Sequence, residues 1–315
     1  MKKLFLTLSI AAALFASDAK VKVVFDAGGS TQDPYATVVS NGAKAAAKDL
    51  GVDLTLQYSD WDPNKMLQNF NTAMGTNPDA IVIMGHPGNE LYAPYVKQAR
   101  DRGIYVTSVD TSLNDLREKY TAEGFGYAGV SYTELGTLIA NAAISKVNLA
   151  KGDEIILWGL KEQPTRGIVT RKVIELLEAA GVVIHYQEIS PEINKDTSLG
   201  HSVFAGLITS YPNSKVFIVL HGGLSGASAG FAKTLNSKIP LIASSVNPGV
   251  LKGIEEGQVL FSYDPQPYLQ GYLGVLQAYM SKKYGFAGIN ALTGGGFVDK
   301  NNIGAFKELV KKGIR

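Results

Sequence analysis

The stretch KVVFDAGGSTQDPYATVVSNGAKAAAKDLG, residues 22–51, sets a pattern that the rest of the chain repeats. It opens with a β-branched strand, expected over Lys22–Ala27, and continues through a loop of small and polar residues into an amphipathic helix. In that helix apolar residues recur at helical spacing from Tyr35 to Leu50, and Gly51 follows as a C-terminal stop. The stretch therefore predicts one strand–loop–helix unit of an α/β fold.

Eight further strands are expected, most of them continuous apolar runs rich in Val and Ile. Such runs are typical of strands that are buried on both faces of a parallel sheet. Helical patterns separate the runs, so the chain predicts right-handed crossovers and open, doubly wound sheets. The expected strands are Leu54–Tyr58, Ala80–Met84, Ile104–Val109, Ile155–Trp158, Val182–Gln187, Lys215–Leu220, Leu241–Ser244 and Val259–Ser262.

The chain of 315 residues is too long for one such sheet, so we expect the pattern to restart. A glycine-rich, weakly strand-like stretch, Gly124–Ser131, precedes a helix expected over Thr133–Val147, and we place a crossing between two lobes there. Further crossings are expected near Ser262–Pro265 and Ala291–Phe297, separated by a long helix over Tyr268–Tyr284. We therefore predict an α/β fold of two doubly wound parallel-sheet lobes joined by a three-strand hinge, with a cleft between the strand ends. The N-terminal lobe is expected to comprise residues 20–129 and 263–291, and the C-terminal lobe residues 130–262 and 292–315.

The first 19 residues indicate export. Lys2 and Lys3 form a cationic region, Leu4–Phe15 an apolar one, and Ser17 and Ala19 the small residues of a cleavage site. We predict a signal peptide over these residues and a soluble mature protein in the periplasm; the alternative is an apolar N-terminal element of the domain. The chain has no cysteine, so its core must hold the fold without disulfides. With a net charge of +2 and no basic tract, the composition favours neither nucleic acid nor an anionic membrane as a partner.

Several turns at the strand ends carry a recognisable pattern. They are Thr31-Gln32-Asp33-Pro34-Tyr35, Asp110 at the end of the strand from Tyr105, Gly159–Arg166 opening a helix, Tyr211-Pro212 and Asp264-Pro265. In these turns, and over essentially the whole mature sequence, the chain resembles the ribose-binding-like periplasmic solute-binding proteins of sugar ABC transporters, which have the type I periplasmic binding fold. The resemblance implies a receptor that captures a small molecule between its lobes and delivers it to a transporter permease, with a chemoreceptor as a second candidate partner.

The same resemblance implies which residues bind the ligand. Asp33 occupies a position that bonds sugar hydroxyls, Tyr35 an aromatic position that stacks on a ring, and Asp110 matches the strand-end aspartate of the family. A carboxylate accepts hydrogen bonds from adjacent hydroxyls, and an aromatic face covers the C–H side of a sugar. The other positions taken as ligand-binding are His86, Thr111, Trp158, Arg166, His221, Ser245, Tyr263 and Asp264. Trp61 is interpreted as a residue of the lobe surface.

Two departures from the family pattern bear on the ligand. Thr111 stands where pentose and hexose binders often carry an arginine, and Ser245 where many members have an aspartate. The ordinary ribose or galactose pattern is therefore not reproduced. Because the cleft keeps acceptors and aromatics but few arginines, we predict a small neutral polyhydroxylated ligand. It is a pentose, hexose or polyol, with a furanose-like signalling molecule as the alternative.

Other functions fit the sequence less well. An exported carbohydrate-active enzyme would need a paired acid and base in the cleft, whereas the family uses its aspartates as hydrogen-bond acceptors, so we expect no catalytic residues. A metal would need more ligands at recognisable spacing than His86 and His221 supply. Gly124–Gly129 fits G-x-G-x-x-G but follows a charged, loop-like stretch, so we expect no dinucleotide cofactor. A transcriptional regulator is excluded because the export signal occupies the place of a helix-turn-helix.

Overall fold

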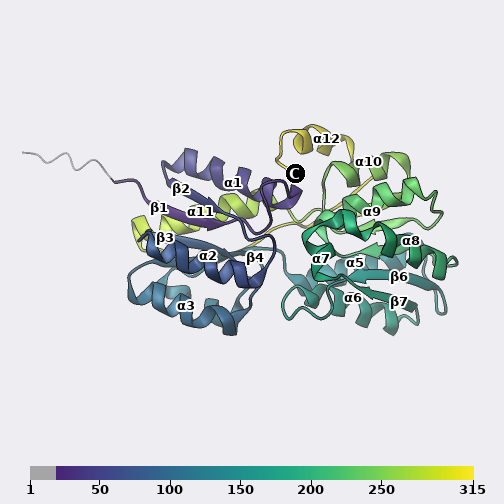
Figure 1. The fold of residues 1–315 in the computed structure, drawn as a ribbon, viewed down its shortest axis with the longest axis horizontal. Coiled ribbons are helices and arrows are strands. Elements are labelled where there is room, and N and C mark those ends of the chain that lie inside the picture. The colour runs from purple at the N-terminus through teal and green to yellow at the C-terminus, as the bar shows by residue number, and fades with distance from the viewer. Residues whose placement is uncertain (1–18) are drawn as a thin grey trace, which may run out of the picture.

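A computed structural model describes residues 19–315 of the chain and shows two α/β lobes side by side (Figure 1). The predicted signal peptide lies, except for Ala19, outside the described residues. The first sheet has the strand order β11-β5-β4-β3-β1-β2, and all its neighbouring strands are parallel. Its strands are β1 (Lys22–Asp26), β2 (Asp53–Gln57), β3 (Ala80–Met84), β4 (Tyr105–Asp110), β5 (Tyr127–Gly129) and β11 (Asn290–Leu292).

The second sheet has the order β12-β10-β9-β8-β6-β7 and is parallel except for β12, which pairs antiparallel with β10. Its strands are β6 (Glu154–Gly159), β7 (Val183–Glu188), β8 (Phe217–Val219), β9 (Leu241–Ala243), β10 (Val259–Tyr263) and β12 (Phe297–Asp299). The predicted fold of two doubly wound lobes is confirmed, and every strand expected from the sequence is present within two residues at either end. The short strand β5 lies in the stretch that the sequence marked as only weakly strand-like, and two more short strands, β11 and β12, were not expected.

Helices cover both faces of each sheet. In the first lobe α1 and α11 pack together on one face, and α2 and α3 lie on the other (Figure 1). In the second lobe α5 and α6 cover one face, while α8, α9 and α10 cover the opposite one. The first-lobe helices are α1 (Pro34–Leu50), α2 (Pro63–Gly75), α3 (Asn89–Asp101), α4 (Asn114–Tyr120) and α11 (Pro267–Tyr284). Those of the second are α5 (Tyr132–Val147), α6 (Gly167–Ala179), α7 (Pro191–Lys195), α8 (His201–Ser210), α9 (Gly222–Thr234), α10 (Pro248–Glu256) and α12 (Gly304–Lys311). Within residues 19–315 no helix is long and apolar enough to cross a membrane.

Several helices begin with the same capping motif, a polar N-cap residue followed by proline. Asp33 accepts the N–H of Ala36 at 2.8 Å, and Asp62 and Asn247 cap α2 and α10 in the same way. The side chain satisfies an otherwise unpaired helix N–H, and the ring of proline fixes the backbone of the first turn. Because parallel strands bring the chain to one edge of the sheet, these polar turns gather at the edge that faces the other lobe.

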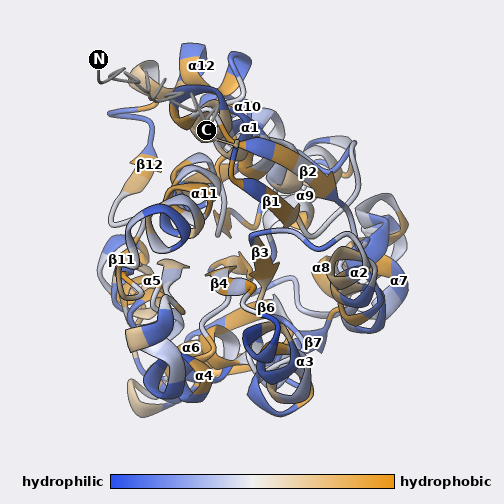
Figure 2. Ribbon diagram, turned by 90° about the vertical axis from the view of Figure 1, so that its left-hand side faces the viewer, coloured by the Kyte–Doolittle hydropathy of each residue, from blue (hydrophilic) through white to orange (hydrophobic). Residues whose placement is uncertain are grey.

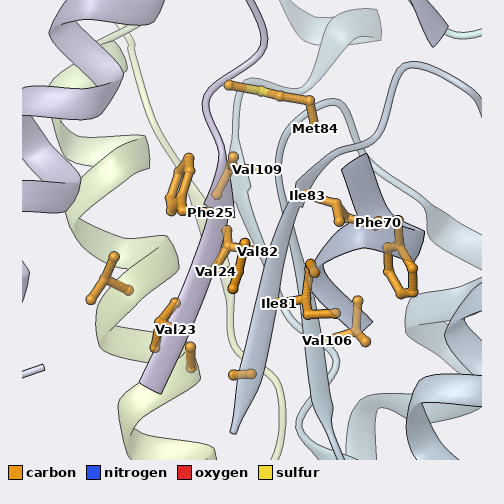
Figure 3. Close-up of a cluster of buried hydrophobic side chains, with 14 of the residues drawn as sticks. Val23, Val24, Phe25, Phe70, Ile81, Val82, Ile83, Met84, Val106 and Val109 are labelled. Carbon is orange, nitrogen blue, oxygen red and sulfur yellow. The ribbon is translucent and has the colours of Figure 1, made fainter. Parts of the chain in front are cut away.

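The first core forms on both faces of its sheet, as the alternation of strand side chains requires. Figure 3 shows Ile81 and Ile83 of β3 beside Phe70 of α2, whereas Phe25 and Val82 point to the opposite face. The side chains of Phe25, Val82 and Val109 there lie close to Gly274 of α11. In Figure 2 the strands are largely orange and the helices around them carry much of the blue, which agrees with strands buried on both faces.

Two glycines set the contact between α1 and α11. A Cβ atom at Gly42 would lie 1.9 Å from the backbone oxygen of Tyr268, and one at Gly271 would lie 2.0 Å from the backbone oxygen of Val39. The two helix backbones therefore touch at this point, which only glycine permits.

The chain passes between the lobes at three places. It leaves the first sheet after β5 and enters α5, returns after β10 into α11, and crosses again between β11 and β12. Each lobe is therefore built from segments that are far apart in the sequence. The cleft lies between two bodies that only these three connections join covalently.

Candidate ligand-binding site

A cavity of about 100 Å³ lies between the two lobes and is lined from both sides. Six of the eleven residues predicted from the sequence line it: Asp33, Tyr35, His86 and Asp110 from the first lobe, and Arg166 and His221 from the second. Polar and aromatic residues that were not predicted to bind the ligand complete the wall, chiefly Trp61, Tyr132 and Ser244. The carboxyl ends of parallel strands thus supply the site, as the fold class requires.

Asp110 is the centre of the site. Its carboxylate accepts hydrogen bonds from Tyr35 Oη at 2.6 Å, Tyr132 Oη at 3.2 Å and Thr111 Oγ1 at 3.3 Å, and its Oδ2 lies 2.8 Å from Nε2 of His86. Burial would raise the pKa of Asp110, but the hydrogen bonds of His86 and Tyr35 and the charge of Arg166 outweigh it and lower the pKa to about 2. The carboxylate is therefore ionised throughout the physiological range.

The two tyrosines hold Asp110 from different lobes. Tyr35 begins α1 in the first lobe, and Tyr132 begins α5 in the second, directly after the first crossing. Burial and the negative charge of Asp110 raise the pKa of both hydroxyls well above the usual value for tyrosine. Each therefore keeps its proton as a donor. The hydroxyl of Tyr132 also lies 2.8 Å from Thr111 Oγ1. Thr111 therefore contacts residues of the site but does not itself line the cavity.

Trp61 lies in the site, so its interpretation as a surface residue was wrong. Its side chain is buried, its indole N–H donates to Asp33 at 3.0 Å, and its ring lies 5.4 Å from that of His86. The backbone of Trp61 has a left-handed φ of 56°, an unusual value for a bulky residue and one that often marks a functional position. Gly28 makes room for the ring, since a Cβ there would lie 2.2 Å from the indole. In the sequence, the adjacent glycines that follow the first strand could have indicated this position of the ring, because they leave room for a bulky side chain.

In the second lobe Asn194 joins Arg166 to His221. Its side-chain oxygen accepts from Arg166 Nη1 at 3.0 Å and lies 3.1 Å from His221 Nε2. His221 also caps α9, because its Nδ1 accepts the N–H of Leu224 at 3.1 Å. Burial and the nearby charge of Arg166 lower the pKa of His221 to about 3, so it stays neutral. Asn194, on the short helix α7, was not expected from the sequence.

Direct contacts join the lobes around the cavity. The hydroxyl of Thr165 in the second lobe donates to the backbone oxygen of His86 at 3.2 Å, and the guanidinium of Arg166 lies 6.0 Å from the centre of the Trp61 ring. A longer ion pair joins Lys195 to Asp62 at 3.8 Å. The lobes are therefore closed upon each other in this structure.

Two predicted residues near strand ends do not line the cavity. Trp158 is fully buried in the second core, with its ring 6.1 Å from that of Phe217. Its position on β6 directs the side chain to the face covered by α8 and α9. Ser245 is buried beside the cavity, which its neighbour Ser244 lines instead.

Tyr263 and Asp264 also lie away from the cavity, at the second crossing. The ring of Tyr263 packs on Phe297 of the neighbouring strand, with 5.9 Å between ring centres. Asp264 forms an ion pair with Arg315 at 3.0 Å, and burial raises the pKa of its carboxyl despite that partner. These two residues connect the hinge segments, and of this turn only Pro265 lines the cavity.

Residues 17–283 match a family model described as a periplasmic binding protein domain. Among solved structures, a carbohydrate transporter from Acidothermus cellulolyticus in complex with myo-inositol is 22% identical, covers 94% of this chain and 100% of its own, and has a TM-score of 0.76. A solute-binding protein from Burkholderia graminis in complex with D-arabinose is 20% identical, with coverage of 91% and 98% and a TM-score of 0.77. One from Actinobacillus succinogenes with bound D-allose is 17% identical, with coverage of 91% and 100% and a TM-score of 0.76. At these identities the likeness shows the fold.

Proposed function

Because the chain belongs to the periplasmic binding protein domain family, we propose that it is the solute-binding protein of a sugar ABC transporter. It is exported to the periplasm, captures a small neutral polyhydroxylated ligand between its lobes, and delivers it to a permease, with a chemoreceptor as a second candidate partner. The observation that carries the proposal is the ionised Asp110 at the cavity, held by hydroxyl donors from both lobes. Sugars and polyols present hydroxyl groups of the same kind.

The charge of the cavity favours a neutral ligand. Two carboxylates, Asp33 and Asp110, line it together with one guanidinium, that of Arg166, while the pKa values of His86 and His221 are lowered below the usual value for histidine. A carboxylated or phosphorylated ligand would be drawn to the arginine but repelled by both aspartates. The indole of Trp61 offers an apolar face to the C–H side of a sugar ring. The ligands named for similar solved structures, myo-inositol, D-arabinose and D-allose, belong to the same class.

A binding protein suits these groups better than an enzyme does. A general acid needs a pKa near the working pH, whereas the pKa of Asp110 is about 2 and its oxygens already accept several hydrogen bonds. Among residues 19–315 no cluster of three or more acidic, histidine or cysteine side chains is arranged to hold a metal ion. A receptor for a furanose-like signalling molecule is the nearest alternative, because it would use the same acceptors and aromatic face.

A thermal-shift screen of residues 20–315 tests the proposed function. We expect a large rise in melting temperature with one of myo-inositol, D-arabinose or D-allose, and none with amino acids or nucleosides. A ligand at a thousand times its Kd stabilises the folded state by about 4 kcal/mol, which such a screen detects easily. A shift produced only by a charged compound, or by none of the neutral ones, would contradict the proposal.

Tryptophan fluorescence offers a second test, because the chain has two tryptophans in contrasting places. Trp61 lines the cavity, whereas Trp158 is fully buried in the second core. We expect Trp158→Phe to retain a fluorescence change when the active sugar of the screen is added, and Trp61→Phe to lose it. A change that disappears with Trp158→Phe would place the ligand elsewhere.

A further inference from the structure

One buried carboxylate of the first lobe has no part in the site described above. Asp26 ends β1, is only 4% exposed and does not line the cavity. Its Oδ1 accepts from the backbone N–H of Gly28 at 2.8 Å and from the hydroxyl of Ser59 at 3.0 Å, and its Oδ2 accepts from the amide of Asn69 at 3.0 Å. Burial raises the pKa of Asp26 although these donors lower it, so its charge does not add to the stability of the lobe at neutral pH.

The hydrogen bonds of Asp26 hold the loop of residues 58–61, which follows β2, precedes α2 and contains Trp61. The amide nitrogen of Asn69 that donates to Asp26 also donates to the backbone oxygen of Tyr58 at 3.1 Å. Asn69 belongs to α2, so one carboxylate connects the start of the loop to a strand on one side and to a helix on the other.

The rest of the loop lies against the glycines that follow β1. The backbone N–H of Ser59 donates to the backbone oxygen of Gly28 at 2.6 Å, and the hydroxyl of the same serine bonds Asp26. Asp60 and Trp61 come next, with left-handed φ values of 52° and 56°. Two consecutive residues other than glycine keep such a conformation only where surrounding contacts enforce it. The contacts made by Asp26 lie directly before them in the loop.

We propose that Asp26 is a positioning residue, which holds the loop of residues 58–61 so that the ring of Trp61 is already in the cavity wall before the ligand arrives. The inference rests on the proposed function and deepens it. A binding group that is held in place in advance raises affinity, because less conformational freedom is lost on binding. Affinity falls in proportion to the fraction of molecules in which that group is in place.

Asp26→Asn tests the role of the carboxylate, because asparagine has the same shape but cannot accept at both positions. Whichever way the amide lies, its nitrogen faces the N–H of Gly28 or the amide nitrogen of Asn69. If Trp61 is then in place in about a tenth of the molecules, the active sugar of the screen binds about tenfold more weakly, which calorimetric titration measures. Wild-type affinity in Asp26→Asn would contradict the inference.

The fluorescence of Trp61 gives a readout that needs no ligand. In a Trp158→Phe background Trp61 is the only tryptophan of the chain. We expect Asp26→Asn to shift the emission of the free protein to longer wavelength and to make it more easily quenched by acrylamide, because a displaced indole meets water. Unchanged emission and quenching would overturn the inference, whether or not any sugar binds.

Asp79→Asn is the matched control, because it removes a similar bond at the other end of the same strand. The carboxylate of Asp79 accepts the backbone N–H of Lys22, the first residue of β1, at 2.8 Å and forms an ion pair with Lys282 at 2.9 Å. This variant should lower the melting temperature but leave the affinity and the emission of Trp61 unchanged. The same shift of emission in Asp79→Asn would show a general loosening of the lobe and contradict the assignment to Asp26.

A double-mutant cycle separates positioning from loss of structure. Asp26→Asn should weaken binding about tenfold alone and by less than about twofold when Trp61→Ala is present, because no ring remains to be positioned. Equal losses in the two backgrounds would contradict the inference while leaving the receptor function intact. If none of the neutral sugars binds, the proposed function fails, and the emission of the free proteins alone decides the role of Asp26.

A second variant covers the case in which melting curves show that Asp26→Asn does not fold. Asn69→Ala leaves the carboxylate with the donors Gly28 and Ser59 but removes the amide that it shares with the backbone of Tyr58. We expect the same direction of change in the emission of Trp61, again in the Trp158→Phe background. A folded Asn69→Ala variant with wild-type emission and quenching would contradict the inference.

Discussion

The substitution Asp110→Asn is expected to lower the affinity for the active sugar at least about 100-fold and the free energy of unfolding by about 2–4 kcal/mol. The carboxylate accepts from Tyr35, Thr111 and Tyr132 and pairs with His86, and an amide nitrogen in place of one oxygen cannot accept at all. Asparagine is the right replacement because Asp110 has a φ of 62°, a left-handed conformation that asparagine tolerates and alanine does not. Calorimetric titration and urea denaturation measure the two effects.

The matched control is Asp101→Asn on α3, where the exposed carboxylate forms an ion pair with Lys97. It should change affinity and stability by no more than about 0.5 kcal/mol. The pKa of about 2 at Asp110 adds a pH test. A lowered pKa contributes stability above the unfolded value near 4, and this contribution, about 2–3 kcal/mol, is lost as the pH falls toward 2. Asp110→Asn should therefore be less sensitive to acid than the wild type, and equal sensitivity would contradict the assignment.

Gly271→Ala is expected to cause the largest loss of stability without touching the site, about 3 kcal/mol or more. The new methyl group would lie 2.0 Å from the backbone oxygen of Val39, so α1 and α11 would have to separate along their contact. A helix backbone cannot yield locally as a flexible side chain can. Urea denaturation measures the loss.

Gly206→Ala on α8 is the control for the glycine substitution. No atom lies within 4 Å of a Cβ built there, and alanine favours a helix over glycine by about 0.5–1 kcal/mol, so this variant should be slightly more stable than the wild type. A mild effect of Gly271→Ala, similar in size to that of Gly206→Ala, would show that the two helices are not locked by their backbones.

The sequence predicted the long elements of the fold because their patterns are local. Runs such as Ala80–Met84 are buried on both faces, and their uniform apolar character marks them as parallel strands. The strands β11 and β12, which were missed, and β5, whose stretch was only weakly strand-like, have three residues each. They pair because the hinge brings distant segments together at the sheet edges. Such pairing leaves no alternating or apolar pattern in the local sequence from which a strand could be predicted.

The site was predictable where a residue directly ends a strand. Asp110 does so, and Asp33 caps the helix that follows the first strand. Trp158 and Ser245 are near strand ends too, but one residue of register decides which face a side chain takes, and composition does not fix it. Trp61 was missed because an unusual backbone conformation and the space above Gly28 turn it inward. Asn194 lies on α7, 28 residues from Arg166 and 27 from His221, so no local pattern in the sequence connects it to the residues that it contacts.

The contact between α1 and α11 also determines when the first lobe can finish folding. During synthesis β1 to β5 emerge first, yet one face of their sheet is covered by α11, and its edge strand is β11. Both belong to the last part of the chain, so the lobe that is begun first cannot close its core until most of the second lobe has been made. Completion of the first lobe is therefore delayed during synthesis, which would suit the export to the periplasm proposed above.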